Sequence, residues 1–235
     1  MDSINSQWPQ NFTLSMTNNC ALNPLTNAQH ILCVLTICLV SVFIPQFVHA
    51  SRTPDWQQTV RYEMDLTLDE STRSIGGDAH ITYTNNSPDT LATLWFRLAP
   101  AALQGGSVVD TTAMRGRHAH WSHQHPETWG DLVAGIAEAR DGHQVTFEQD
   151  FSIGRLHIDP PLGPGESVVF TLPFTTTLPT GGSQSRMGYT QGQFKGAYWY
   201  PQICPYTPEF GWTVNRYFGT AEAYGEFADY IINYT

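Results

Sequence analysis

Four histidines in one short stretch are the residues whose spacing most directly suggests chemistry. His118, His120, His123 and His125 make up four of the nine histidines of the chain. Neutral imidazole is the commonest metal ligand, so this spacing is compatible with zinc, copper or nickel. The ligands of a metal must also converge, and no neighbouring set of carboxylates or cysteines completes a tetrahedral site here. A solvated surface loop therefore stays open as the alternative, and we assign no metal ligand.

The chain contains no motif of a self-contained active site. HExxH, the zinc-peptidase motif, is absent because no histidine is followed by glutamate. G-x-S-x-G, the P-loop and G-x-G-x-x-G are absent as well. We therefore assign no catalytic residue and expect the chain to be inactive alone.

An aromatic tract over residues 187–230 is the next feature that suggests function. It holds two of the seven tryptophans and seven of the ten tyrosines. Rings in this number would form an apolar patch if they lay in water, so the tract must pack against a core or a partner. The alternative is a carbohydrate platform, in which a ring such as that of Trp199 stacks on a sugar.

Composition narrows the class of protein. Hydrophobic residues make up 41% of the 235 residues and charged residues 14%, which is typical of a folded chain. The net charge of −10 argues against nucleic-acid binding, which requires a basic surface. We therefore expect no nucleic-acid partner.

The first 50 residues read as a leader. All eleven Lys and Arg lie after position 50, and residues 31–48 are almost continuously apolar. Val48-His49-Ala50 fits a signal-peptidase site with cleavage before Ser51. Because 18 residues can just span a bilayer, a membrane anchor stays open, as does a buried helix. We expect a hydrophobic helix in the leader, residues 1–50, and a protein that is exported or membrane-anchored.

The remaining residues, 51–235, predict an all-β domain. Val60, Tyr62, Met64, Leu66 and Leu68 alternate with polar residues, which indicates a half-buried strand. Similar short apolar runs recur between Gly/Pro turns, whereas no segment has a sustained helical period. This pattern predicts an antiparallel β-sandwich or saddle. We expect the strands over 75–83, 91–98, 132–139, 144–148, 155–158, 168–174 and 229–234, of which 132–139 and 144–148 form a hairpin.

The order of several segments resembles the N-terminal β-saddle of the M1 family of zinc aminopeptidases, the gluzincins. The resemblance covers about residues 57–235. The segments that carry it are 62–69, 75–85, 89–98, 159–168, 186–188, 198–203 and 226–232.

The resemblance implies a role for two glutamines. In the family, the β domain contributes a Gln or Glu that holds the free α-amine of the substrate, shortly before an aromatic-rich segment. Thr190-Gln-Gly-Gln-Phe matches this context and nominates Gln193, with Gln191 as the second choice. A side-chain carbonyl accepts hydrogen bonds from an ammonium group and positions it. The other interpretation makes Gln193 a polar turn residue.

The resemblance also implies what the chain lacks. The full-length family binds zinc in a catalytic domain that follows the β domain, and no part of that domain is in this sequence. We expect the non-catalytic N-terminal domain of an exported M1-like aminopeptidase, truncated before the zinc site. Its partners are the catalytic zinc-peptidase domain or a peptide substrate. The alternative is a free-standing extracytoplasmic binding or scaffold domain for a carbohydrate or a protein.

Overall fold

The computed structural model describes residues 56–111, 125–180, 186–217 and 224–235. The chain divides into residues 1–52 and 53–235, and every described residue belongs to the second unit. The predicted leader and its hydrophobic helix lie outside the described residues. Within the described ranges, no helix is long and apolar enough to span a bilayer.

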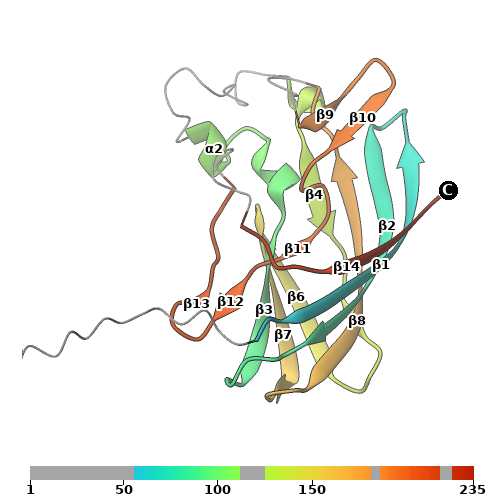
Figure 1. Ribbon diagram of the computed structural model, residues 1–235. Coiled ribbons are helices and arrows are strands. Elements are labelled where there is room, and N and C mark those ends of the chain that lie inside the picture. The colour runs from blue at the N-terminus through green and yellow to red at the C-terminus, as the bar shows by residue number, and fades with distance from the viewer. Residues whose placement is uncertain (1–55, 112–124, 181–185, 218–223) are drawn as a thin grey trace, which may run out of the picture. The chain divides into compact units, whose positions relative to one another are not determined.

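The largest sheet of the second unit has six strands (Figure 1). Its order is β14-β1-β2-β8-β4, and β5 also pairs with β8. All of its pairings are antiparallel except that of β14 with β1. The strands are β1 (Thr59–Asp69), β2 (Ser74–Thr84), β4 (Asp131–Ala134), β5 (Glu138–Ala139), β8 (Ser167–Thr177) and β14 (Asp229–Tyr234).

A second, four-stranded sheet has the order β11-β3-β7-β6 and is antiparallel throughout. Two small hairpins, β9–β10 and β12–β13, and three short helices complete the described part. The four strands are β3 (Leu91–Arg97), β6 (Gln144–Asp150), β7 (Ile153–Leu162) and β11 (Gln202–Ile203). The other elements are β9 (Met187–Thr190), β10 (Gln193–Gly196), β12 (Tyr206–Thr207), β13 (Gly211–Trp212), η1 (Ala99–Ala102), α2 (Val108–Thr111) and η3 (Pro126–Thr128).

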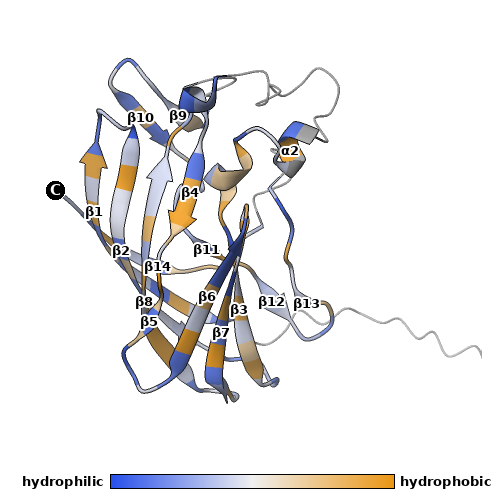
Figure 2. Ribbon diagram, turned by 180° about the vertical axis from the view of Figure 1, so that it is seen from behind, coloured by the Kyte–Doolittle hydropathy of each residue, from blue (hydrophilic) through white to orange (hydrophobic). Residues whose placement is uncertain are grey.

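The core lies between the two sheets and follows the alternation seen in the sequence. In β1, Val60, Tyr62, Met64 and Leu66 are each at most 2% exposed, and the residues between them are exposed. The hydropathy colours alternate along the strands in the same way (Figure 2). The predicted all-β sandwich is therefore confirmed. Leu68 is 40% exposed, so the prediction that it continues the buried face was wrong.

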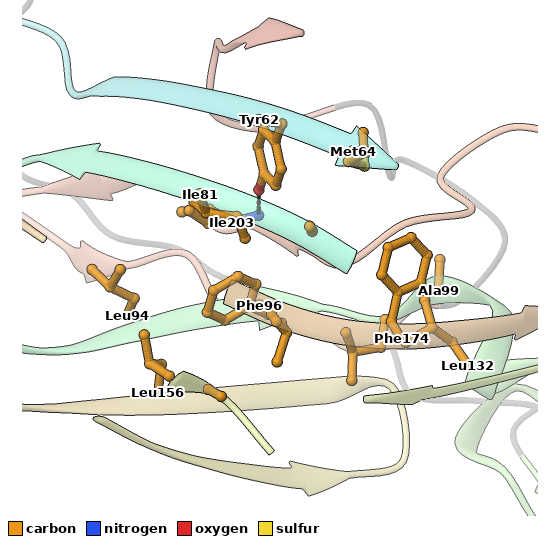
Figure 3. Packing of buried hydrophobic residues seen from close by; sticks show 14 of the residues in the cluster. Tyr62, Met64, Ile81, Leu94, Phe96, Ala99, Leu132, Leu156, Phe174 and Ile203 are labelled. Carbon is orange, nitrogen blue, oxygen red and sulfur yellow. Dashed lines mark hydrogen bonds between the residues drawn. The ribbon is translucent and has the colours of Figure 1, made fainter. Parts of the chain in front are cut away.

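A tyrosine links the two sheets through the core. Figure 3 shows Tyr62 pointing from β1 towards the main chain of β11. The Ile203 N–H donates to Tyr62 Oη over 3.0 Å, and Tyr62 Oη donates to the carbonyl oxygen of Pro201 over 3.2 Å. Burial raises the pKa of Tyr62 well above its usual value, so the phenol stays neutral.

The predicted hairpin of 132–139 with 144–148 is wrong. The Asp141–Gly142 turn does connect β5 to β6, but β5 pairs with β8 and β6 pairs with β7, in different sheets. The polar groups beside the turn explain the split. Val169 N–H donates to the Asp141 carboxylate, and Arg140 N–H donates to the Val169 carbonyl over 2.8 Å, which binds the turn to β8.

The strand predicted over 229–234 is confirmed as β14, with the same bounds. Its pairing differs from the antiparallel arrangement expected, because β14 runs parallel to β1 from Arg61↔Asp229 to Leu66↔Tyr234. A parallel neighbour requires a long crossover, and here the rest of the domain separates the two strands.

Candidate functional site

The β9–β10 hairpin carries both nominated glutamines. Its strands pair from Met187↔Gly196 to Thr190↔Gln193 around a two-residue turn. Gln191 and Gly192, the turn residues, have φ values of 47° and 77°. Positive φ at both central positions is the type I′ geometry that suits the twist of a two-residue hairpin. The tight turn therefore fixes where each glutamine lies.

Gln193 is the first residue of β10 and is exposed, as is Gln191. Phe194 packs edge-on against Tyr189 across the hairpin, with ring centroids 5.1 Å apart. Successive side chains of a strand point to opposite faces, so Gln193 lies on the face away from these rings. Within the described part of the chain, neither glutamine side chain makes a hydrogen bond. Their amide groups are therefore accessible to a ligand or a partner.

The hairpin is held beside the turn between β1 and β2. Tyr189 Oη donates to Glu70 Oε1 over 2.6 Å, and this hydrogen bond raises the pKa of Tyr189. A second anchor is the Tyr189 N–H, which donates to the Pro179 carbonyl over 2.9 Å. A Cβ added at Gly192 would lie 3.6 Å from Glu70 Oε1. A carboxylate therefore lies against the turn of the nominated glutamines.

Glu70 was not expected at this site. It is 119 positions from Tyr189, and in the sequence it is one of several polar residues in a turn. No local signal connects it to the hairpin. An exposed carboxylate beside the turn is an acceptor that suits an ammonium group, in addition to the amide oxygens of the two glutamines.

Most of the aromatic tract packs on the domain itself. The rings that lie against the core are those of Tyr189, Phe194, Tyr198, Trp199, Tyr200, Tyr206 and Trp212. Trp199 contacts Phe174, with centroids 6.0 Å apart, and Tyr200, at 5.6 Å. The tract therefore has its own core as its main partner. This position makes Trp199 a packing residue in the described structure.

The exposed part of the tract continues into an apolar strip, which we define as residues 224–234. Exposed side chains in this strip include Phe227 (77%), Tyr224 (55%) and Tyr234 (51%). Ile231 and Ile232, in β14, are 44% and 38% exposed. Because β14 is an edge strand of the large sheet, one row of its backbone groups is unpaired as well.

The strip and the hairpin approach the same end of the large sheet (Figure 1). β14 runs in the direction of β1, and its Tyr234 pairs with Leu66, near the end of β1 at Asp69. Glu70 follows immediately and holds the β9–β10 hairpin. The end of the strip and the hairpin are therefore both attached to the end of β1 and the turn that follows it.

The histidine loop contributes little to the described structure. His118, His120 and His123 lie outside the described residues. His125 is exposed, and its Nδ1 is 3.6 Å from a carboxylate oxygen of Glu127. In the ranges that the structure covers, no group of three His, Cys, Asp or Glu side chains could hold a metal ion.

No protein-family model matches the chain. No curated protein matches it. Solved structures of M1 zinc metallopeptidases do match, and they belong to the family that the sequence resembles. A mutant of a two-domain member bound to L-arginine matches over 76% of this chain and 32% of its own, with 13% identity and a TM-score of 0.39.

Two further M1 structures match over a smaller part of the chain. A mutant of a two-domain member bound to L-tryptophan matches over 55% of this chain and 22% of its own, at 17% identity and a TM-score of 0.34. The enzyme from Deinococcus radiodurans matches over 52% and 21%, at 17% identity and a TM-score of 0.33. The chain thus spans between 21% and 32% of the length of these proteins.

Proposed function

We propose that this chain is the non-catalytic N-terminal β domain of an exported M1-like aminopeptidase, which acts when joined to a zinc-peptidase domain. The order of the segments in the sequence suggests the family. The exposed apolar strip 224–234 is the observation that carries the proposal. The described residues do not form a zinc site, so we assign no hydrolytic step to this chain.

The strip supports the proposal because several of its large apolar side chains lie in water. Phe227 alone leaves 77% of its surface in water, and two adjacent isoleucines of β14 are more than a third exposed. Large apolar side chains left exposed in one segment of a folded domain are typical of an interaction site. A second domain placed on this strip would remove these side chains from water and cover the edge of the large sheet.

The β9–β10 hairpin supports a contribution to substrate binding. Gln193, with Gln191 as the second choice, supplies an amide oxygen, and Glu70 supplies a carboxylate next to the turn. In the joined protein these acceptors would hold the free α-ammonium group of a peptide substrate. Their role is to position the substrate, since none of them activates water.

Export is the sequence-based part of the proposal. Residues 31–48 would either act as a signal peptide that is cleaved before Ser51, or stay uncleaved and anchor the chain in the membrane. A protease-protection assay on intact cells tests this part separately from the enzymatic one.

The decisive experiment begins with the gene. We expect the DNA downstream of the Thr235 codon to encode an HExxH zinc domain, and unrelated sequence there would contradict the proposal. The joined protein should hydrolyse aminoacyl-nitroanilides, whereas the 235-residue chain with added zinc should not. Appreciable turnover by the chain alone would refute its non-catalytic role.

Variants of the joined protein test the site itself. Gln193→Ala should raise KM about tenfold, which corresponds to the loss of about one hydrogen bond to a charged group. A substrate without the free amine should show no such change. The matched control is Gln144→Ala, an exposed glutamine that begins β6 in the other sheet, and its KM should equal that of the unmodified protein.

A further inference from the structure

A cleft of about 410 Å³ opens on the outer face of the four-stranded sheet. None of its lining residues belongs to the β9–β10 hairpin or to the apolar strip. Its volume is within the range of about 300 to 1,000 Å³ that small-molecule sites occupy. The lining residues are Trp95, Glu148, Gln149, Asp150, Ile153, Arg155, Val214 and Arg216.

One wall of the cleft is a row of side chains across three strands. Trp95 of β3 lies opposite Arg155 of β7, which lies opposite Glu148 of β6. The Arg155 guanidinium forms an ion pair with Glu148 and lies 5.6 Å from the centre of the Trp95 ring. Both contacts fix the orientation of the guanidinium, so its remaining N–H groups point in defined directions.

The second wall comes from the segment that follows β13. Arg216 forms an ion pair with the Asp150 carboxylate and also donates to the Asp150 carbonyl over 3.3 Å. Val214 lies beside it, and Ile153 of β7 adds a second apolar side chain. The end of β6 that carries the two acidic residues is hydrophilic (Figure 2).

Stability alone does not account for these pairs. The four charged side chains are between 32% and 68% exposed. Exposed ion pairs contribute about 0 to 1 kcal/mol. Two such pairs and a half-buried tryptophan line one cleft, where their exposed polar groups are available to a ligand.

The charges of the cleft determine which ligand fits. The charges of the two guanidinium groups and the two carboxylates cancel. A charged ligand would therefore have to displace one side chain from an existing ion pair. A neutral molecule with many hydroxyl groups need not do so, because each hydroxyl both donates and accepts a hydrogen bond. Trp95 adds an apolar surface and an indole N–H that has no hydrogen-bond partner among the described residues.

We propose that this cleft binds a neutral saccharide of one or two rings. Vicinal hydroxyls would bridge the Arg216–Asp150 pair on one side and the Arg155–Glu148 pair on the other. The C–H face of the sugar would lie against Trp95 and Val214.

Saturation-transfer NMR on the full 235-residue chain tests the proposal. The neutral probes are glucose, galactose, N-acetylglucosamine, maltose and cellobiose, and the charged probes are glucuronate and diglycine. We expect at least one neutral sugar to bind, with a dissociation constant of about 1 mM, as an open site would give. Binding of a charged probe without any neutral sugar would overturn the proposal, as would the absence of any signal.

Variants locate the binding. Trp95→Ala and Arg216→Gln should each weaken sugar binding about tenfold, the loss of roughly one hydrogen bond or packing contact. Arg216→Gln keeps the test valid if Trp95→Ala fails to fold, since Arg216 lies outside the sheets. The matched control is Arg61→Gln, which breaks a similarly exposed ion pair to Glu63 on β1. Equal affinity of Arg216→Gln and the unmodified chain would refute this location.

Discussion

Replacing Tyr62 with phenylalanine would remove one oxygen atom from the core and leave its shape almost unchanged. Tyr62 is 1% exposed, and its hydroxyl is bonded to Ile203 N–H and to the Pro201 carbonyl. Ile203 is itself 1% exposed, so water cannot replace the lost partner. A buried donor left without a partner costs about 1 to 3 kcal/mol. Because no cavity forms, we expect Tyr62→Phe to reduce the free energy of unfolding by about 2 kcal/mol.

Urea denaturation followed by tryptophan fluorescence measures this change. For a domain of this size, about 2 kcal/mol also lowers Tm by roughly 4 to 8 °C. The control is Tyr189→Phe, which removes a hydroxyl whose partner, Glu70, is exposed to water and can be hydrated instead, so this variant should be less destabilised than Tyr62→Phe. If the two variants were equally stable, the hydrogen bond across the core would not hold the sheets together as we argue.

Two further changes test the packing and the electrostatics of the domain. Gly154→Ala should reduce the free energy of unfolding, measured by urea denaturation, by about 1 to 3 kcal/mol. The reason is that the added methyl group would overlap the Phe147 ring and lie 3.2 Å from Phe96 Cβ. The control is Gly163→Ala, whose methyl group would meet only the flexible Glu166 carboxylate and should reduce the free energy of unfolding less. Burial raises the pKa of Glu226. The protonated side chain therefore contributes fully to stability below the unfolded-state pKa, and this contribution is lost as the pH rises through the folded-state pKa. We therefore expect Glu226→Gln to stabilise the fold near pH 7, by less than about 1 kcal/mol after solvent screening, and to change little near pH 4. A stabilisation that is the same at both pH values would contradict this assignment.

The alternation of polar and apolar residues predicted the strands because burial on one face has a period of two. Val60 to Leu66 fill the core as expected. The same rule failed at Leu68, where β1 runs past the second sheet and both faces meet water. The Asp141–Gly142 turn was found correctly, but its flanking strands belong to different sheets. A turn signal is local, whereas the choice of a strand partner depends on contacts far along the chain.

The candidate sites show the same limit. The type I′ turn depends on its own two residues, Gln191 and Gly192. The order of the segments around this turn nominated Gln193. Glu70 could not be found because its relation to the hairpin exists only after the sheets have assembled. Arg216 and Trp95, which meet at the cleft, are separated by more than half of the chain and share no motif.

The parallel pairing of β14 with β1 also affects how the chain is made. Thr67 meets Thr235 across 168 positions of sequence, so the outer edge of β1 has no neighbour until the last described residues are synthesised. At about 5 to 20 residues per second, that edge stays open for roughly 10 to 30 s on the ribosome. An unpaired strand edge is a template for association with other chains. We therefore expect the nascent chain to depend on chaperones during this interval, and a ribosome-stalled chain without β14 to aggregate more readily than one that includes β14.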